Sequence, residues 1–270
     1  AGVSTSASLE MACAVMFDGY FQAGIPLWDL ALLCRRAENG FAGVGCGILD
    51  QAVAALAKPG HIVAIDCSCD RAYEVIPCGF KEVEVLVIHS GVSRRLTAGF
   101  YDQLVSDCRT VQQKLSYVTA PRCEHLAHAS LADLKGIVKQ LPERQLKRAL
   151  HVLTTARIAE VALAAIRRGD PLLFGMTTVA QYRSLKDLHG VTVPELERLV
   201  EFLQREPWVY AANMMGGGGG GAVFALCEAG QAAGVLERVK ESLFNNENPV
   251  AFITGLGGGP WTECAASHQL

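Results

Sequence analysis

The chain has 270 residues and a formal net charge of −3, from 24 Lys and Arg against 27 Asp and Glu. Hydrophobic residues make up 50% and charged residues 19%, which excludes an intrinsically disordered chain. No basic surplus is present to neutralise phosphates, so we expect no nucleic-acid partner. We also expect no membrane partner, because charges interrupt the apolar runs before about 18 residues, and no signal peptide pattern opens the chain.

The first third of the chain predicts helices, loops and two strands. Small residues and hydroxyls over 1–8 are typical of a loop. Helices are expected over 9–17, 26–38 and 51–57, with a glycine-punctuated loop over 40–47. Alternation and β-branched residues predict strands over 61–66 and 83–89.

The rest of the chain predicts a helical middle and a small sheet at the end. Helices are expected over 98–115, 144–168, 172–187 and 194–204. Strands follow over 208–213, 222–227 and 250–253, with a helix over 231–243. The segment 119–130 is the best candidate for a linker or exposed loop. This order of elements indicates an α+β fold.

The opening loop is a candidate phosphate site. Free N–H groups at a helix N-terminus bind anions, and the macrodipole favours negative charge there. Ser4, Thr5 and Ser6 add hydroxyl donors or a metal ligand. The simpler alternative is that one serine only caps the helix. The loop is not a Walker motif, because it contains no Gly-Lys-Ser/Thr.

A second candidate site surrounds Asp50. Alternating glycines at 43, 45 and 47 allow close backbone approach and place Asp50 at a helix start, where its carboxylate can cap the helix or act as a general base. Glu38 lies near the end of the preceding helix. A carboxylate with a serine hydroxyl suits Mg²⁺, which needs few protein oxygens. Taken singly, an N-cap at Asp50 and a solvated Glu38 are the simpler interpretations.

Two further motifs are ambiguous. Six glycines at 216–221 lie between two expected strands, where they suit either close packing against another loop or a flexible tip. A Rossmann interpretation fails because a strand follows, not a helix. The ten cysteines indicate reduced, mostly buried thiols in a cytoplasmic protein. Cys67–Cys69 and the Cys123, His125, His128 cluster lack the second pair of a structural zinc site.

Several segments together resemble the galactokinases of the GHMP kinase superfamily. Gly2–Glu10 is similar to the superfamily's phosphate loop, and Leu33–Asn39 followed by Gly45–Gln51 is closely galactokinase-like. Shorter matches lie at 149–152, 174–175 and 184–185, and Met214–Leu226 resembles the third superfamily motif. The resemblance implies a two-lobed α+β fold, with an incomplete N-terminal lobe over 1–118 and a ferredoxin-like C-terminal lobe over 119–270.

The resemblance also implies roles for individual residues in phosphoryl transfer from ATP to a sugar, with galactose as the default. Ser6 and Glu38 match Mg²⁺ ligands, and Asp50 matches the catalytic carboxylate. Gly47 and Tyr101 match residues near the sugar. The ATP phosphates would contact Gly2, Ser4, Thr5, Ser6, Ala7 and Ser8. The third-motif glycines, which would support the phosphate loop, are Gly216, Gly217, Gly218 and Gly220.

The chain departs from the family pattern at several points. The family's N-terminal Arg and Gly-Glu-His-Thr-Asp signature is absent, so we expect a truncated kinase or one completed by a partner chain, with little turnover alone. Asn213–Met215 replaces Arg-Met-Thr, Gly219 replaces a Phe, and Gln181–Tyr182 replaces Ser-His. A non-catalytic sugar- or nucleotide-binding protein is therefore the alternative. Loss of a central strand or two should expose a sheet edge and apolar surface, so marginal solubility or association is expected.

Overall fold

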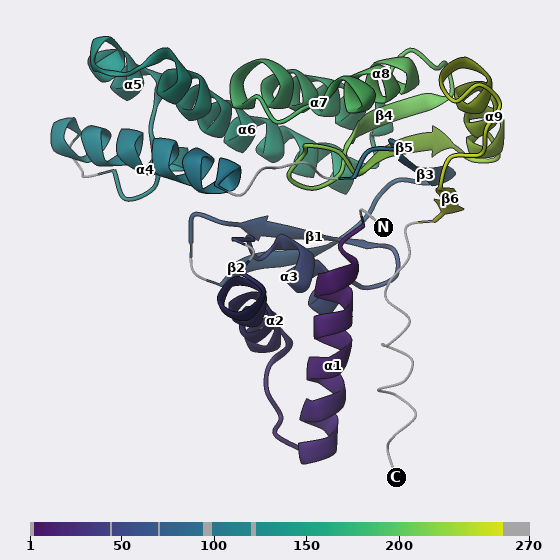
Figure 1. Ribbon diagram of the computed structural model, residues 1–270, viewed down its shortest axis with the longest axis horizontal. Helices are drawn as coiled ribbons and strands as arrows, with labels where there is room; N and C mark the ends of the chain where they lie inside the picture. The colour runs from purple at the N-terminus through teal and green to yellow at the C-terminus, as the bar shows by residue number, and fades with distance from the viewer. Residues whose placement is uncertain (1–2, 44, 70, 94–98, 120–122, 256–270) are drawn as a thin grey trace. The chain divides into compact units, whose positions relative to one another are not determined.

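The computed structural model describes residues 3–43, 45–69, 71–93, 99–119 and 123–255 (Figure 1). The chain forms two compact units. Among the described residues, the first unit comprises those up to Cys78 together with Thr254 and Gly255, and the second comprises those from Gly79 to Ile253.

The first unit packs three helices with a β-hairpin. Its elements are α1 (Thr5–Phe21), α2 (Leu27–Ala37), a π-helical turn (Glu38–Ala42), α3 (Leu49–Leu56), β1 (His61–Asp66) and β2 (Ala72–Pro77). The strands pair antiparallel, with His61 opposite Pro77. Met11, Trp28, Ala31 and Ala52 form the centre of the core, one or more from each helix. The core therefore fixes the start of α1 against α2 and α3, the three segments that carry the candidate site.

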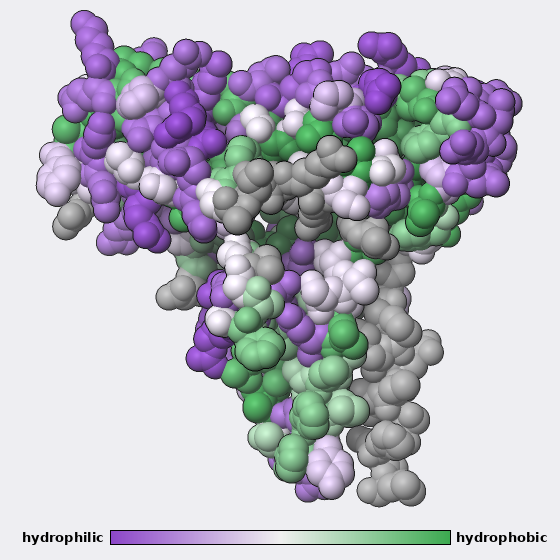
Figure 2. All heavy atoms as spheres, viewed as in Figure 1, coloured by the Kyte–Doolittle hydropathy of each residue, from purple (hydrophilic) through white to green (hydrophobic). Residues whose placement is uncertain are grey.

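One face of α1 is apolar and exposed. Leu9, Met16, Phe17 and Tyr20 are between 55% and 80% exposed, and their spacing places them along one side of the helix. Figure 2 shows hydrophobic side chains gathered over this part of the molecule. The expected exposed apolar surface is thus present, and self-association stays a prediction.

The second unit combines a four-stranded sheet with six helices in its described part. Its helices are α4 (Phe100–Val118), α5 (Leu131–Ile137), α6 (Glu143–Arg168), α7 (Pro171–Ser184), α8 (Pro194–Leu203) and α9 (Ala232–Leu243). The strands are β3 (Val83–His89), β4 (Val209–Met214), β5 (Ala222–Glu228) and β6 (Ala251–Thr254). Short 3₁₀ turns lie at Leu126–His128 and Val138–Gln140, and a π-helical turn, Leu185–His189, extends α7.

The sheet has the strand order β4-β5-β3-β6, with β5 antiparallel to both of its neighbours. Along the chain, helices α4 to α8 connect β3 to β4, β5 follows β4 directly, and α9 connects β5 to β6. This βαββαβ order, with this strand order, is the ferredoxin-like arrangement. α7 and α8 pack against β4, and α9 packs against β3. Leu86, Ile88, Leu199 and Val223 are fully or nearly fully buried between these layers. The predicted α+β class and ferredoxin-like second half are confirmed.

The helical part of the second unit has its own core. Cys123, Leu126 and Ala129 are buried with Val111 and Leu115 of α4. The prediction of a linker over 119–130 is therefore wrong for its described residues, although the side chains at 124, 128 and 130 are exposed. Apolar side chains in this segment complete the packing between α4 and α6. Because α4 packs on α6, the compact units divide before α4 and not after it. The lobe division at 118 itself stays a prediction.

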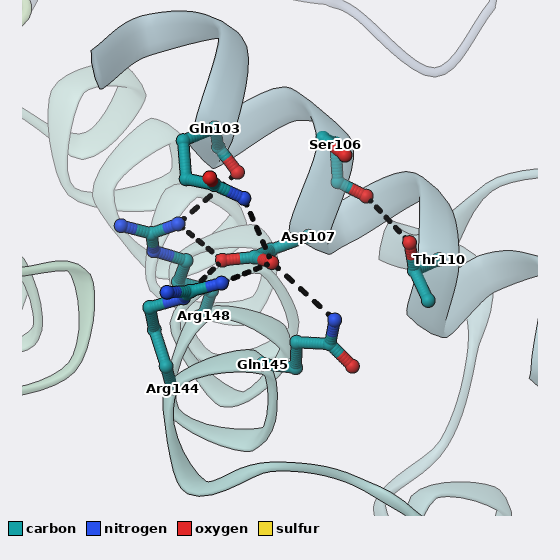
Figure 3. Close-up of polar contacts among 7 residues, drawn as sticks. All are labelled: Gln103, Ser106, Asp107, Thr110, Arg144, Gln145 and Arg148. Carbon is teal, nitrogen blue, oxygen red and sulfur yellow. Dashed lines mark hydrogen bonds and ion pairs between the residues drawn. The ribbon is translucent and has the colours of Figure 1, made fainter. Parts of the chain in front are cut away.

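A buried carboxylate joins α4 to α6 (Figure 3). Asp107 is 2% exposed and accepts hydrogen bonds from Arg144, Arg148, Gln145 and Gln103. Burial by itself raises the pKa of Asp107, but the hydrogen bonds from Arg144 and Gln145 and both guanidinium charges outweigh it and lower the pKa. The carboxylate therefore stays ionised inside the helical layer and fixes the register of the two helices.

α6 is long and apolar enough, by length and composition, to cross a membrane. Within 149–166 only Arg157 and Glu160 are charged, so charges interrupt this run as expected, but two charges are few enough for the helix to remain a candidate span. These two side chains pair with each other at 2.9 Å on the exposed face. α6 also packs against α4 and α7, and core helices of globular domains meet the same criteria. The finding is weak support for a membrane span.

Candidate active site

The start of α1 has an unusual backbone. Ser4 precedes the helix in the left-handed region, at φ 57° and ψ 44°, and its side chain makes no capping hydrogen bond. A residue other than glycine adopts this conformation rarely and at a cost. The carbonyl of Ser4 accepts from both the N–H and the hydroxyl of Ser8, each at 3.1 Å. Capping by Ser4 is thus excluded, and Gly2 lies outside the described residues.

Ser6 and Glu38 are brought together, as the resemblance implies. Ser6 Oγ donates to Glu38 Oε1 at 2.9 Å across 32 residues of sequence. Ser6 is exposed on the first turn of α1, whereas Glu38 is 9% exposed at the start of the π-helical turn that ends α2. The interpretation of Glu38 as a solvated helix end is therefore wrong. The π-turn turns this carboxylate inward, toward α1.

The second oxygen of Glu38 is held by protein donors that sequence reasoning missed. Gln51 Nε2 donates to Glu38 Oε2 at 2.5 Å, and the Cys46 thiol donates to the same oxygen at 3.3 Å. Asn39 Oδ1 accepts from the backbone N–H of Cys46 at 2.9 Å, which closes the glycine-rich loop. Both residues belong to the galactokinase-like stretch Gly45–Gln51, Cys46 in the loop before α3 and Gln51 on α3 itself. Neither residue was given a role by the sequence motifs.

Glu10 completes this polar cluster. It lies one turn after Ser6 on α1, and its Oε2 accepts from Gln51 Nε2 at 3.4 Å. Burial raises the pKa of Glu10, the hydrogen bond from Gln51 opposes the rise, and the nearby charge of Glu38 adds to it. Burial also raises the pKa of Cys46 to about 11, with a further rise from Glu38. Cys46 is thus a neutral thiol donor, not a reactive thiolate.

Asp50 lies in the first turn of α3, and Ile48, not Asp50, occupies the N-cap position. The N-cap interpretation is therefore wrong. Asp50 is half-buried, and within the described part of the chain its carboxylate has no hydrogen-bond or ion-pair partner. Gly47 is exposed in the loop just before it. An unpaired carboxylate at a helix start is free to accept a proton from a bound hydroxyl.

The oxygen pair of Ser6 and Glu38 fits Mg²⁺. Neighbouring oxygen ligands of an octahedral Mg²⁺ lie about 3.0 Å apart, because each metal–oxygen distance is about 2.1 Å. The observed 2.9 Å separation matches that spacing. Mg²⁺ takes its remaining ligands from phosphates and water. Among the described residues no group of three or more His, Cys, Asp or Glu side chains is arranged to hold a metal, which gives no support to a site at Cys67 or Cys123.

The third-motif loop is closely packed within the second unit. Gly218–Gly221 are buried, and the N–H groups of Gly219 and Gly221 donate to the carbonyls of Val191 and Val92 at 2.8 and 2.9 Å. A Cβ at Gly218 would lie 2.2 Å from the Val191 carbonyl oxygen. Close packing against neighbouring loops is confirmed, and a flexible tip is excluded.

The remaining predicted residues also belong to the second unit. Tyr101 lies on the first turn of α4 and is 42% exposed, and Gly216 and Gly217 are exposed in the third-motif loop. The predicted roles of these residues beside the sugar and the phosphates stay predictions.

Comparison with known proteins identifies the family. Residues 1–58 match the family model for the GHMP kinases N terminal domain, and residues 162–245 match the model described as GHMP kinases C terminal. The chain belongs to the GHMP kinases. The two models match the chain in the same order as their names, so the start of α1 and the third-motif loop each lie within the corresponding family domain.

The similarity within this family is to galactokinases. The chain is 35% identical to galactokinase of Bos taurus and 34% identical to that of Homo sapiens, over 89% of its length in both cases. The structure matches that of Lactococcus lactis galactokinase complexed with galactose, with a TM-score of 0.85 and 26% identity over 94% of this chain. The chain spans 59% of the length of the two mammalian relatives and 66% of the bacterial structure.

Proposed function

We propose that the chain acts in ATP-dependent phosphorylation of a sugar, most simply galactose at its C1 hydroxyl. The observation that carries this proposal is the Ser6–Glu38 oxygen pair, 2.9 Å apart beside the uncapped start of α1. A divalent cation and a phosphate group find complementary donors there, since a helix start offers N–H groups to anions. The same first unit supplies the unpaired carboxylate of Asp50 for the acceptor hydroxyl.

Each residue has a distinct role in this proposal. The α1 start, from Ser4 to Ser8, binds the phosphates of ATP. Ser6 and Glu38 hold Mg²⁺, which neutralises charge on the transferring phosphoryl group when bound. Asp50 accepts or orients the proton of the attacking hydroxyl. Because phosphoryl transfer needs mainly positioning and charge stabilisation, these few groups suffice for the phosphate end of the reaction.

Galactose is the proposed sugar because the relatives are galactokinases and the Lactococcus lactis enzyme is complexed with galactose. Gly47 and Asp50 of the first unit are the candidate contacts to it. Other sugars with the same arrangement of hydroxyls are competitors, and an ADP-release assay against a panel of sugars ranks them directly.

Calorimetric titration of the chain with Mg·ATP tests the nucleotide site. We expect binding to the wild-type chain, a loss of at least about tenfold in Ser6→Ala, and retention in Asp50→Ala. Ser106→Ala, an exposed serine on α4, is the matched control and should bind like the wild type. No binding to the folded wild-type chain, or equal binding by the two serine variants, would refute the proposed site.

A second candidate is a non-catalytic nucleotide- or sugar-binding protein. The altered third motif favours it, because Met215 stands where the family has a threonine hydroxyl, and Asn213 is buried and accepts from the backbone N–H of Met214 at 2.8 Å. Galactose-dependent release of ADP that Asp50→Ala abolishes supports the kinase and excludes the second candidate. Mg·ATP binding without such release agrees with both functions, because little turnover is expected of this chain alone.

A further inference from the structure

Gln51 is the most deeply buried polar side chain among the described residues, at 1% exposed. It follows Asp50 directly on α3. Burying an amide costs free energy unless its hydrogen bonds are made, and an apolar side chain of the same size would fill the space without that cost. Gln51 Oε1 is buried without a hydrogen-bond partner among the described residues, so the contacts of Nε2 alone indicate what the amide does.

The two N–H groups of Gln51 lie between two carboxylates. Nε2 is 2.5 Å from Glu38 Oε2 and 3.4 Å from Glu10 Oε2. The opposite orientation of the amide would place its carbonyl oxygen against both carboxylates, so the hydrogen-bond network fixes which end faces them. Gln51 thereby connects α3 both to α1 and to the turn that ends α2.

These contacts divide the two oxygens of Glu38 between different tasks. Oε2 is occupied by Gln51 and by the Cys46 thiol at 3.3 Å, both of which are protein donors. Oε1 faces the exposed Ser6 hydroxyl at 2.9 Å. A carboxylate free to rotate about its last bond would present either oxygen, whereas this one is restrained.

We propose that Gln51 is a positioning residue for the metal site, holding Glu38 Oε2 so that Oε1 is presented to Mg²⁺ together with Ser6 Oγ. This inference rests on the proposed function. Partners of ligating carboxylates orient them, and their loss lowers metal affinity by about 10- to 100-fold. Because Gln51 and Asp50 are consecutive residues of one helix, the same rigid element supports the metal ligand and the proton acceptor.

The Mg²⁺ dependence of ATP binding to the full chain tests this proposal. The variant Gln51→Met keeps the volume and removes the donor, and we expect it to need about 10- to 100-fold more Mg²⁺ for half-maximal ATP binding in calorimetry. Gln113→Met, an exposed glutamine of α4, is the matched control and should leave the Mg²⁺ requirement unchanged. If circular dichroism shows that Gln51→Met does not fold, Gln51→Asn decides, because the shorter amide withdraws from Glu38; the same loss is expected.

A double-mutant cycle with Glu38→Gln separates positioning from simple packing. In that background the carboxylate is already absent, so Gln51→Met should change the Mg²⁺ requirement by less than about twofold. Two results would overturn the positioning role alone. In the first, Gln51→Met raises the Mg²⁺ requirement by the same factor with and without Glu38→Gln. In the second, Gln51→Met leaves the Mg²⁺ requirement of the otherwise wild-type chain unchanged. Failure of the folded wild-type chain to bind Mg·ATP would overturn both this role and the proposed function.

Discussion

Replacing Gly218 by alanine should destabilise the second unit through a collision with backbone. Gly218 is buried at φ +84°, and an added Cβ would lie 2.2 Å from the carbonyl oxygen of Val191. That oxygen also accepts a hydrogen bond from Gly219 N–H at 2.8 Å. The carbonyl cannot move away without weakening this bond, so the strain cannot be relieved by a flexible side chain.

The magnitude follows from two contributions. A residue with a Cβ in the left-handed region costs about 1–2 kcal/mol, and overpacking of a closely packed site adds about 1–3 kcal/mol. We therefore expect Gly218→Ala to lower the free energy of unfolding by about 2–5 kcal/mol. Gly230→Ala is the matched control, because Gly230 has φ +79° but nothing within 4 Å of the added Cβ; it should lose about 1–2 kcal/mol.

Urea unfolding followed by circular dichroism measures both losses. The urea midpoints of the two variants should shift by different amounts. The slope of the unfolding free energy against urea concentration should stay the same, because the same surface is exposed on unfolding. Equal destabilisation of the two variants would show that Val191 does not restrict position 218. The close packing of the third-motif loop would then have no energetic consequence, and the reasoning would be refuted.

Three other measurements test the remaining groups. Asp107→Asn should lower the free energy of unfolding by about 3–5 kcal/mol, because the buried Arg148 loses its counter-charge. Urea unfolding at neutral pH measures this loss, and a value under about 1 kcal/mol contradicts the prediction. Burial lowers the pKa of His151 to about 4 and of His189 to about 3. As pH falls below 6.5 the histidines bind protons in the unfolded chain but stay neutral in the folded chain, so the free energy of unfolding should fall by about 1.4 kcal/mol per pH unit for each histidine down to about pH 4. Replacing His189 with phenylalanine should reduce this pH dependence in urea titrations. An unchanged pH dependence contradicts the buried neutral state. Cys46 should react with iodoacetamide far more slowly than the exposed Cys69 at pH 8, and mass spectrometry showing comparable labelling would contradict the thiol-donor role.

Strong local signals made much of the fold predictable. α8 begins at Pro194, as predicted, because proline at the first turn and an apolar 3–4 spacing agree there. β2 was missed because its burial does not alternate and its short run carries Glu74 and ends in Pro77. α5 was also missed, although Ser130 and Asp133 form a capping box that the sequence spacing contains.

Only those residues of the candidate site that belong to a recognisable sequence motif were predictable. The pairing of Ser6 with Glu38 followed from the family resemblance, since nothing local connects residues 32 positions apart. The role of Gln51 was not predictable, because its contacts to Glu38 and Glu10 arise only when three helices pack together. Burial of a polar side chain is a tertiary property that composition and spacing do not report.

The helix starts of this chain differ in a way that agrees with the proposed function. α5 and α7 begin at Ser130 and Asp170, whose side chains accept hydrogen bonds from the first-turn N–H groups of their helices. α1 begins at Ser4 without such a bond, as do α2, α3, α4, α6, α8 and α9, and it differs from them in placing a residue other than glycine in the left-handed conformation at the helix start. A capping side chain would occupy the donors that a phosphate needs, so an anion-binding helix start must forgo that local stabilisation. The left-handed conformation of Ser4 agrees with the proposed phosphate site, in which the ligand would supply acceptors for the first-turn N–H groups of α1.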